Sequence, residues 1–76
     1  METTLAEVGT GDAFHIDHVE NDQLRAKLRR LGFLDGRVEC RTRLTRGPVV
    51  VSRRGTDLAL GASVADGIAI TEVESP

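Results

Sequence analysis

One stretch of the chain has the apolar spacing of a helix. In NDQLRAKLRRLGF, the leucines Leu24, Leu28 and Leu31 recur at i, i+4 and i+7, and this spacing places them on one stripe of a helix. We expect the stripe to face the core. Four cations occupy the other sides of the same helix: Arg25, Lys27, Arg29 and Arg30. The pattern therefore predicts a leucine-striped helix with a basic outer side.

Both ends of this helix carry local signals. Asn21 or Asp22 can cap the first turn, because their side chains accept hydrogen bonds from free backbone N–H groups. Gly32 suits the left-handed position that follows a last turn, and it places Phe33 where it can contact Leu28. We expect the helix to end at this glycine.

The remaining segments have the length and composition of strands. Glycines interrupt the chain at short intervals, and the pieces between them are mostly too short for helices. Turns are expected at Arg46-Gly47-Pro48, at 54–57 and at 65–67. The five predicted strands cover 12–19, 37–45, 49–54, 58–60 and 68–73. Five short strands with one helix after the first predict a mainly β fold, a small curved barrel that spans residues 1–76 as a single domain and leaves few exposed edges.

Alternation along two of these strands assigns side chains to the two faces of the sheet. In the first strand, Phe14 and Ile16 are expected to point inward together with His18. In the second, RVECRTRLT, the inward set is Val38, Cys40, Thr42 and Leu44, and the outward set is Arg37, Glu39, Arg41 and Arg43. We read Cys40 as a small buried hydrophobe.

Charge is distributed in blocks, although the net charge is only −2. All ten basic residues lie in 25–54, where two acids oppose them and leave +8; the flanking segments are purely acidic. Such a block predicts a basic face that attracts an acidic partner. The alternative is that the acidic flanking segments fold back onto the basic middle of the chain and neutralise its charge. The residues expected on this face are Arg25, Lys27, Arg29, Arg30, Arg37, Arg41 and Arg43.

The stretch FHIDHV contains both histidines of the chain around one aspartate. These are metal-ligand residue types, but on a strand His15 and His18 point to opposite faces. A zinc site needs three or four ligands, and the chain has no second cluster of His or Cys to supply them. We therefore predict no metal site and no cofactor here.

Catalytic motifs are absent as well. The sequence contains neither a G-x-S-x-G elbow nor a GxxxxGK[ST] phosphate loop, so we predict no catalytic residues. The basic block leaves a nucleic-acid-binding barrel open as an alternative. The lack of Tyr and Trp argues against it, because single-strand binders offer aromatic rings for stacking. A single cysteine, an N-terminus without signal-peptide features and short apolar runs predict a soluble cytoplasmic protein.

The order of these pieces resembles the FeoA family. Its leading Leu-x-x-Val-x-x-Gly pattern is present as Leu5, Val8 and Gly11, and its most specific motif, LG[FL]xxG, is present as 31–36. The later elements of the pattern are also present: Gly47-Pro48-Val49, Arg54-Gly55, Leu58-Ala59-Leu60 and Ile68-x-Ile70. The segment GASVADG departs from the family, which more often has a charged turn there.

The resemblance implies an SH3-like barrel without catalytic residues or cofactor. It also implies a non-enzymatic accessory role in bacterial ferrous-iron uptake. The implied partner is the membrane ferrous transporter FeoB, which carries a GTP-binding cytoplasmic domain. The basic face is then expected to dock on this transporter, or on anionic lipid headgroups beside it, and to modulate its activity. Two alternatives stay open: a repressor-type or nucleic-acid-binding barrel, and an arginine that stimulates the partner's GTP hydrolysis.

Overall fold

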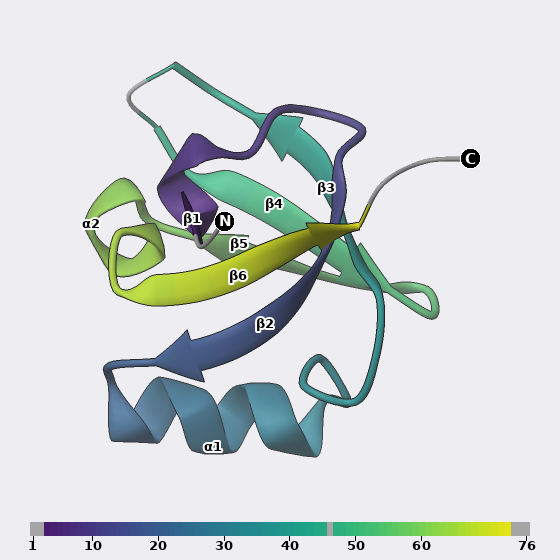
Figure 1. The fold of residues 1–76 in the computed structure, drawn as a ribbon, viewed down its shortest axis with the longest axis vertical. Coiled ribbons are helices and arrows are strands. Elements are labelled where there is room, and N and C mark those ends of the chain that lie inside the picture. The colour runs from purple at the N-terminus through teal and green to yellow at the C-terminus, as the bar shows by residue number, and fades with distance from the viewer. Residues whose placement is uncertain (1–2, 46, 74–76) are drawn as a thin grey trace.

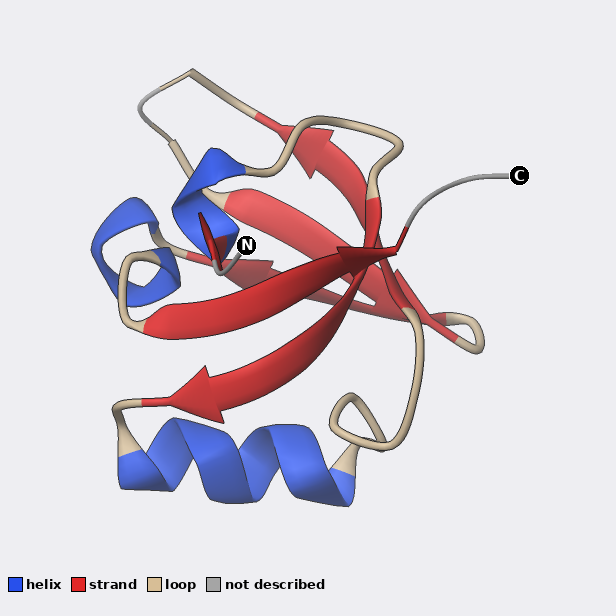
Figure 2. Ribbon diagram, in the orientation of Figure 1, coloured by secondary structure: helices blue, strands red, loops and turns tan. Residues whose placement is uncertain are grey.

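The computed structural model describes residues 3–45 and 47–73. Within these residues the chain forms a curved sheet with one long helix against it (Figures 1 and 2). The elements in chain order are β1 (Thr3–Thr4), the 3-10 helix η1 (Leu5–Glu7), β2 (Ala13–Val19), α1 (Asp22–Arg30), β3 (Val38–Arg43), β4 (Val49–Arg53), β5 (Thr56–Leu60), α2 (Ala62–Ala65) and β6 (Ile68–Val73).

The sheet is antiparallel throughout and has the order β1-β6-β2-β3-β4-β5. The predicted mainly β fold is confirmed, but the described residues form six strands instead of five. The extra strand is short: Thr3 and Thr4 pair with Ile70 and Ala69 of β6. The two ends of the sheet, β1 and β5, are not paired with each other; η1 and α2 pack against each other instead. Helices therefore complete the barrel.

The core lies inside the curve of the sheet and contains only apolar side chains among the described residues. Its largest members are Phe14 from β2, Leu5 from η1, Leu28 from α1 and Phe33 from the turn after α1, all fully buried. Because these residues belong to a single core cluster, the helix and the N-terminal segment share one core with the strands.

The predicted ends of α1 are confirmed. Asn21 Oδ1 accepts a hydrogen bond from the Leu24 N–H at 2.9 Å, so Asn21 is the cap. Gly32 has a φ of 83°. The Phe33 N–H donates to the Leu28 carbonyl at 2.9 Å, and the Gly32 N–H donates to the Arg29 carbonyl at 3.1 Å. This pair of bonds is the Schellman ending.

The predicted leucine stripe is only partly buried. Leu28 is fully buried and Leu24 is half-buried, but Leu31 is 40% exposed. Leu31 is the C-cap, directly after the last residue of α1. The chain turns inward directly after it, and Phe33 is the residue that enters the core. Phe33, from the turn, therefore takes the place in the core that the sequence pattern assigned to Leu31.

Two β-bulges overturn part of the predicted alternation. In β2, Ile16 pairs with Ile70 and His18 pairs with Ala69, which leaves Asp17 as an extra residue. A bulge of this kind changes which side chains point inward. Phe14 is buried and Ile16 is half-buried, as expected, but beyond the bulge Val19 is buried and His18 is exposed. The prediction that His18 points inward was wrong.

The second bulge lies in β3. Cys40 pairs with Val51 and Thr42 pairs with Val50, so Arg41 is the extra residue. Val38 and Cys40 are buried, as predicted, but Thr42 is exposed and Leu44 is 56% exposed. The expected inward direction of Thr42 was wrong for the same reason as in β2, and that of Leu44 was wrong because β3 ends at Arg43.

The turn between β4 and β5 is shorter than predicted. Arg53 pairs with Thr56, so only Arg54 and Gly55 lie in the loop. Their φ values of 50° and 84° are those of a type I′ turn, which matches the twist of the flanking strands. The predicted last strand agrees with β6. Of the turn expected at 46–48, Arg46 lies outside the described residues.

Candidate partner-binding surface

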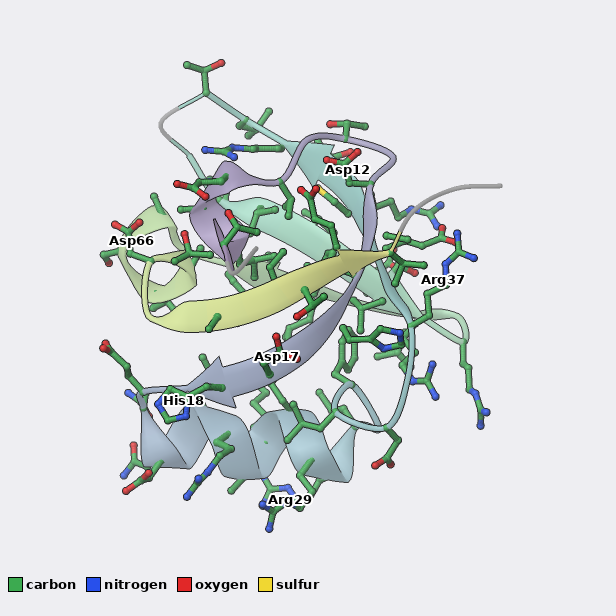
Figure 3. All side chains as sticks on the ribbon, in the orientation of Figure 1. Asp12, Asp17, His18, Arg29, Arg37 and Asp66 are labelled. Carbon is green, nitrogen blue, oxygen red and sulfur yellow. The ribbon has the colours of Figure 1, made fainter. Side chains whose placement is uncertain are left out.

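Four of the seven cations expected on a docking face lie on α1, and all four are exposed. Arg25 forms an ion pair with Asp22 at 3.3 Å, one helical turn earlier. Lys27, Arg29 and Arg30 have no carboxylate within 4.0 Å among residues 3–45 and 47–73. In Figure 3, Arg29 extends from the helix into solvent. The helix therefore offers positive charge that described acidic side chains do not neutralise.

The other three cations make contacts within the molecule. Arg37 Nη2 lies 4.0 Å from Glu39 Oε1, and Arg41 Nε lies 3.5 Å from Asp57 Oδ2. Arg43 Nη1 donates to the Val8 carbonyl at 2.7 Å. Strand β3 leads away from α1 (Figure 1), so Arg41 and Arg43 do not extend the helix surface. Only Arg37, which directly precedes the strand, remains close to the turn after α1.

Arg53 has a role that the sequence did not reveal. Its Nε–H donates to the Gly32 carbonyl at 2.7 Å, and its Nη1–H donates to the Arg37 carbonyl at 3.0 Å. The guanidinium lies against Gly36, where an added Cβ would come within 2.8 Å of both Nη atoms. Arg53 therefore ties β4 to both ends of the turn between α1 and β3.

A hollow of about 270 Å³ lies beside this contact, between the C-terminal end of α1 and the β4–β5 turn. Its lining includes Arg30, Arg53, Arg54, Leu31, Asp35 and Thr56. Arg53 and Arg54 were not among the predicted docking residues. The available signal was the pair of arginines at the end of a β-branched run, but the fold is needed to bring that pair to the end of the helix.

The histidine stretch does not gather metal ligands. His15 and His18 are both exposed, and Asp17 accepts a hydrogen bond from the Thr71 hydroxyl. Figure 3 shows Asp17 beside β6 and His18 at the end of β2. Arg25 and Arg29 line the same hollow as Asp17 and His18, and their charge opposes a bound cation. The part of the chain that the structure describes contains no group of three or more His, Cys, Asp or Glu placed to hold a metal ion.

The cysteine and the aromatic rings are withdrawn from the surface. Cys40 is buried, and this burial, followed by the nearby Asp12 carboxylate, raises the pKa of its thiol. A raised pKa leaves the thiol neutral and a poor nucleophile. The chain has no Tyr or Trp, and its two phenylalanines, Phe14 and Phe33, are both fully buried. Among the described residues, the surface therefore offers no Phe, Tyr or Trp ring on which a nucleic-acid base could stack.

No helix among the described residues is long and apolar enough to cross a membrane. A family model described as the FeoA domain matches residues 3–72. The chain belongs to the FeoA family. A comparison with curated proteins gave no significant match.

Two solved structures support the FeoA fold. One is a crystal structure of an iron uptake regulatory protein, FeoA, with a TM-score of 0.78 and 24% sequence identity; the match covers 96% of this chain and all of the other. The second is an NMR structure of a FeoA-like protein from Clostridium acetobutylicum. It has a TM-score of 0.74 and 19% identity, and the match covers 99% of this chain and 91% of that one.

The motif LGFLDG, which carries most of the resemblance to FeoA, has a structural explanation. Gly32 ends the helix at a positive φ, Phe33 fills the core, and Gly36 leaves room for the Arg53 guanidinium. The segment GASVADG, where the sequence departs from the FeoA pattern, contains α2, and its Ala65 is buried. The sequence pattern predicts only a turn there.

Proposed function

We propose that this FeoA protein is a non-enzymatic, cytoplasmic accessory component of bacterial ferrous-iron uptake. It docks on the cytoplasmic domain of a FeoB-like membrane ferrous transporter and modulates it. Family membership supports the role in iron uptake, and a solved relative is described as an iron uptake regulatory protein. That the partner is the ferrous transporter is our own proposal.

The observation that carries the docking proposal is the exposed basic side of α1. Arg25, Lys27, Arg29 and Arg30 project from one helix, and only Arg25 has a carboxylate partner among the described residues. A group of exposed cations, most of them without a carboxylate partner, attracts an acidic protein surface and speeds its association. The other three predicted cations make contacts elsewhere: Arg37 lies 4.0 Å from Glu39, Arg41 lies 3.5 Å from Asp57, and Arg43 donates to the Val8 carbonyl.

The test is capture of the transporter from bacterial membranes by a tagged copy of the protein. Replacing Arg25, Lys27 and Arg29 with glutamine removes three positive charges from the helix. The melting temperature should stay nearly unchanged, because exposed charges contribute little to stability. Capture should fall, and added salt should weaken capture by the unaltered protein in the same way.

A matched control lowers the net charge by the same amount elsewhere. Thr45→Glu, Ala59→Glu and Ser63→Glu together add three negative charges at exposed positions outside α1. This variant should capture the transporter almost normally. If the helix variant folds and captures as well as the control at low salt, docking through α1 is wrong. If the unaltered protein captures no transporter, the proposed partner is wrong.

A further inference from the structure

Three arginines, one from α1 and two from the end of β4 and its turn, line the hollow beside the β4–β5 turn. Arg30 is the last residue of α1, Arg53 is the last residue of β4, and Arg54 is the first residue of the turn. None of them lies within 4.0 Å of a carboxylate in residues 3–45 or 47–73. Asp35 also lines the hollow, so its net charge is about +2. The hollow therefore favours a negatively charged group.

The Arg53 guanidinium is held in place before any ligand arrives, and the Arg54 side chain starts from a fixed backbone position. The hydrogen bonds from Arg53 to the carbonyls of Gly32 and Arg37 use its Nε and Nη1, and no described acceptor takes a hydrogen bond from its Nη2. Arg54 sits at a φ of 50° in a two-residue turn, which fixes the direction of its Cα–Cβ bond. Groups that are ordered in advance lose less entropy when they bind.

The rest of the lining indicates which anion fits. A guanidinium presents a planar fork of donors that matches a carboxylate, and the Thr56 hydroxyl can donate as well. Leu31, 40% exposed, supplies an apolar wall. A free phosphate does not use such a wall, whereas the methylene stem of an acidic side chain packs against it.

We propose that this hollow receives a glutamate or aspartate side chain from an acidic segment of the protein partner. This inference rests on the proposed function, and it places an anchoring contact at one end of the basic side of α1. The ligand chemistry is a carboxylate on a short side chain, bound by Arg30, Arg53 and Arg54 with its stem against Leu31.

The test is an NMR titration of the ¹⁵N-labelled protein with a hexaglutamate peptide at low salt. The Arg53 Nε–H signal is a direct reporter, because this group is held by the Gly32 carbonyl. We expect it to shift together with the amides of Leu31 and Thr56, and to saturate. Arg30→Gln with Arg54→Gln should raise the Kd roughly 2- to 30-fold, as expected for the loss of two exposed ion pairs.

The matched control is Arg25→Gln with Lys27→Gln, which removes the same charge from the other end of α1. This control should change the Kd much less than the Arg30 and Arg54 pair. Equal weakening by both pairs would show diffuse attraction and overturn the proposal. Inorganic phosphate that shifts the reporter signals, while hexaglutamate leaves them unchanged, would assign the hollow to phosphate instead.

The same variants separate this inference from the proposed function. If hexaglutamate occupies the hollow but the protein captures no ferrous transporter, the partner is wrong and the carboxylate site stands. If the helix variant at Arg25, Lys27 and Arg29 loses the transporter while hexaglutamate does not shift the Arg53 signal, docking stands and the hollow is not its anchor.

Discussion

Replacing Gly36 with alanine should destabilise the protein through its effect on one arginine. The φ of Gly36 is not positive, so its backbone accepts an alanine, but the new Cβ would lie 2.8 Å from both Nη atoms of Arg53. The guanidinium is the end of a flexible side chain and can move away. In doing so, it loses its hydrogen bonds to the carbonyls of Gly32 and Arg37.

The size of the effect follows from these two bonds. A hydrogen bond from a charged donor contributes about 1.5–3 kcal/mol. The bond to Gly32 is part-buried and the bond to Arg37 is exposed, so water replaces much of the second. We therefore expect Gly36→Ala to cost about 2 kcal/mol in the free energy of unfolding. In a domain of this size that lowers the melting temperature by roughly 8–16 °C.

A double-mutant cycle isolates the cause. Arg53→Met removes the guanidinium and keeps much of the stem, and it should itself cost about 2 kcal/mol. In that background Gly36→Ala should cost less than about 0.5 kcal/mol, because nothing remains for the Cβ to displace. Urea denaturation followed by circular dichroism measures all four proteins.

The control is Gly61→Ala, at a glycine with a φ of −63° and no neighbour within 4 Å of an added Cβ. Its cost, whatever its size, should be the same with and without the Arg53 guanidinium. If Gly36→Ala costs as much in the Arg53→Met background as in the unaltered protein, the loss of stability does not come from displacing the Arg53 guanidinium. The proposed steric conflict between the added Cβ at position 36 and Arg53 would then be wrong.

Three further results are expected. Leu28→Ala should cost about 2–5 kcal/mol as a buried large-to-small change, and Leu31→Ala clearly less; equal losses in urea denaturation would contradict the packing described. Burial raises the pKa of the Cys40 thiol above its ordinary 9.0, so the unfolded state ionises first. The free energy of unfolding should then fall as pH rises above that value, and Cys40→Ala should remove this slope in pH-dependent denaturation. His15→Ala with His18→Ala should leave the melting temperature nearly unchanged, and calorimetry with ferrous or zinc ions should show no tight stoichiometric binding; a sub-micromolar site lost in the double variant would refute this.

Helix α1 was predictable because every signal that defines it is local. The Asn21 side chain caps an N–H three residues away, and Gly32 closes the last turn with bonds that span no more than five residues. The strand segments were predictable for a similar reason, since their β-branched runs and glycine boundaries lie within single elements. These features need no information about distant parts of the chain.

Side-chain direction along the strands required the tertiary structure. The bulges at Asp17 and Arg41 arise from pairing with β6 and β4, and β6 in particular is distant from β2 in the sequence. A single extra residue reverses the faces beyond it, because side chains alternate along a strand. That is why His18 and Thr42 are exposed although simple alternation placed them inside.

The candidate site also has one part that local sequence predicts and one part that depends on the tertiary structure. The cations of α1 were identified from sequence because helical spacing alone separates Arg25, Lys27 and Arg29 from the leucines. The hollow was not, because Arg53 meets a carbonyl 21 residues earlier in the chain. Such a contact depends on how β4 passes the end of α1. Local spacing therefore determined which charges surround the helix, and only the packing of strand against turn decided which arginines converge.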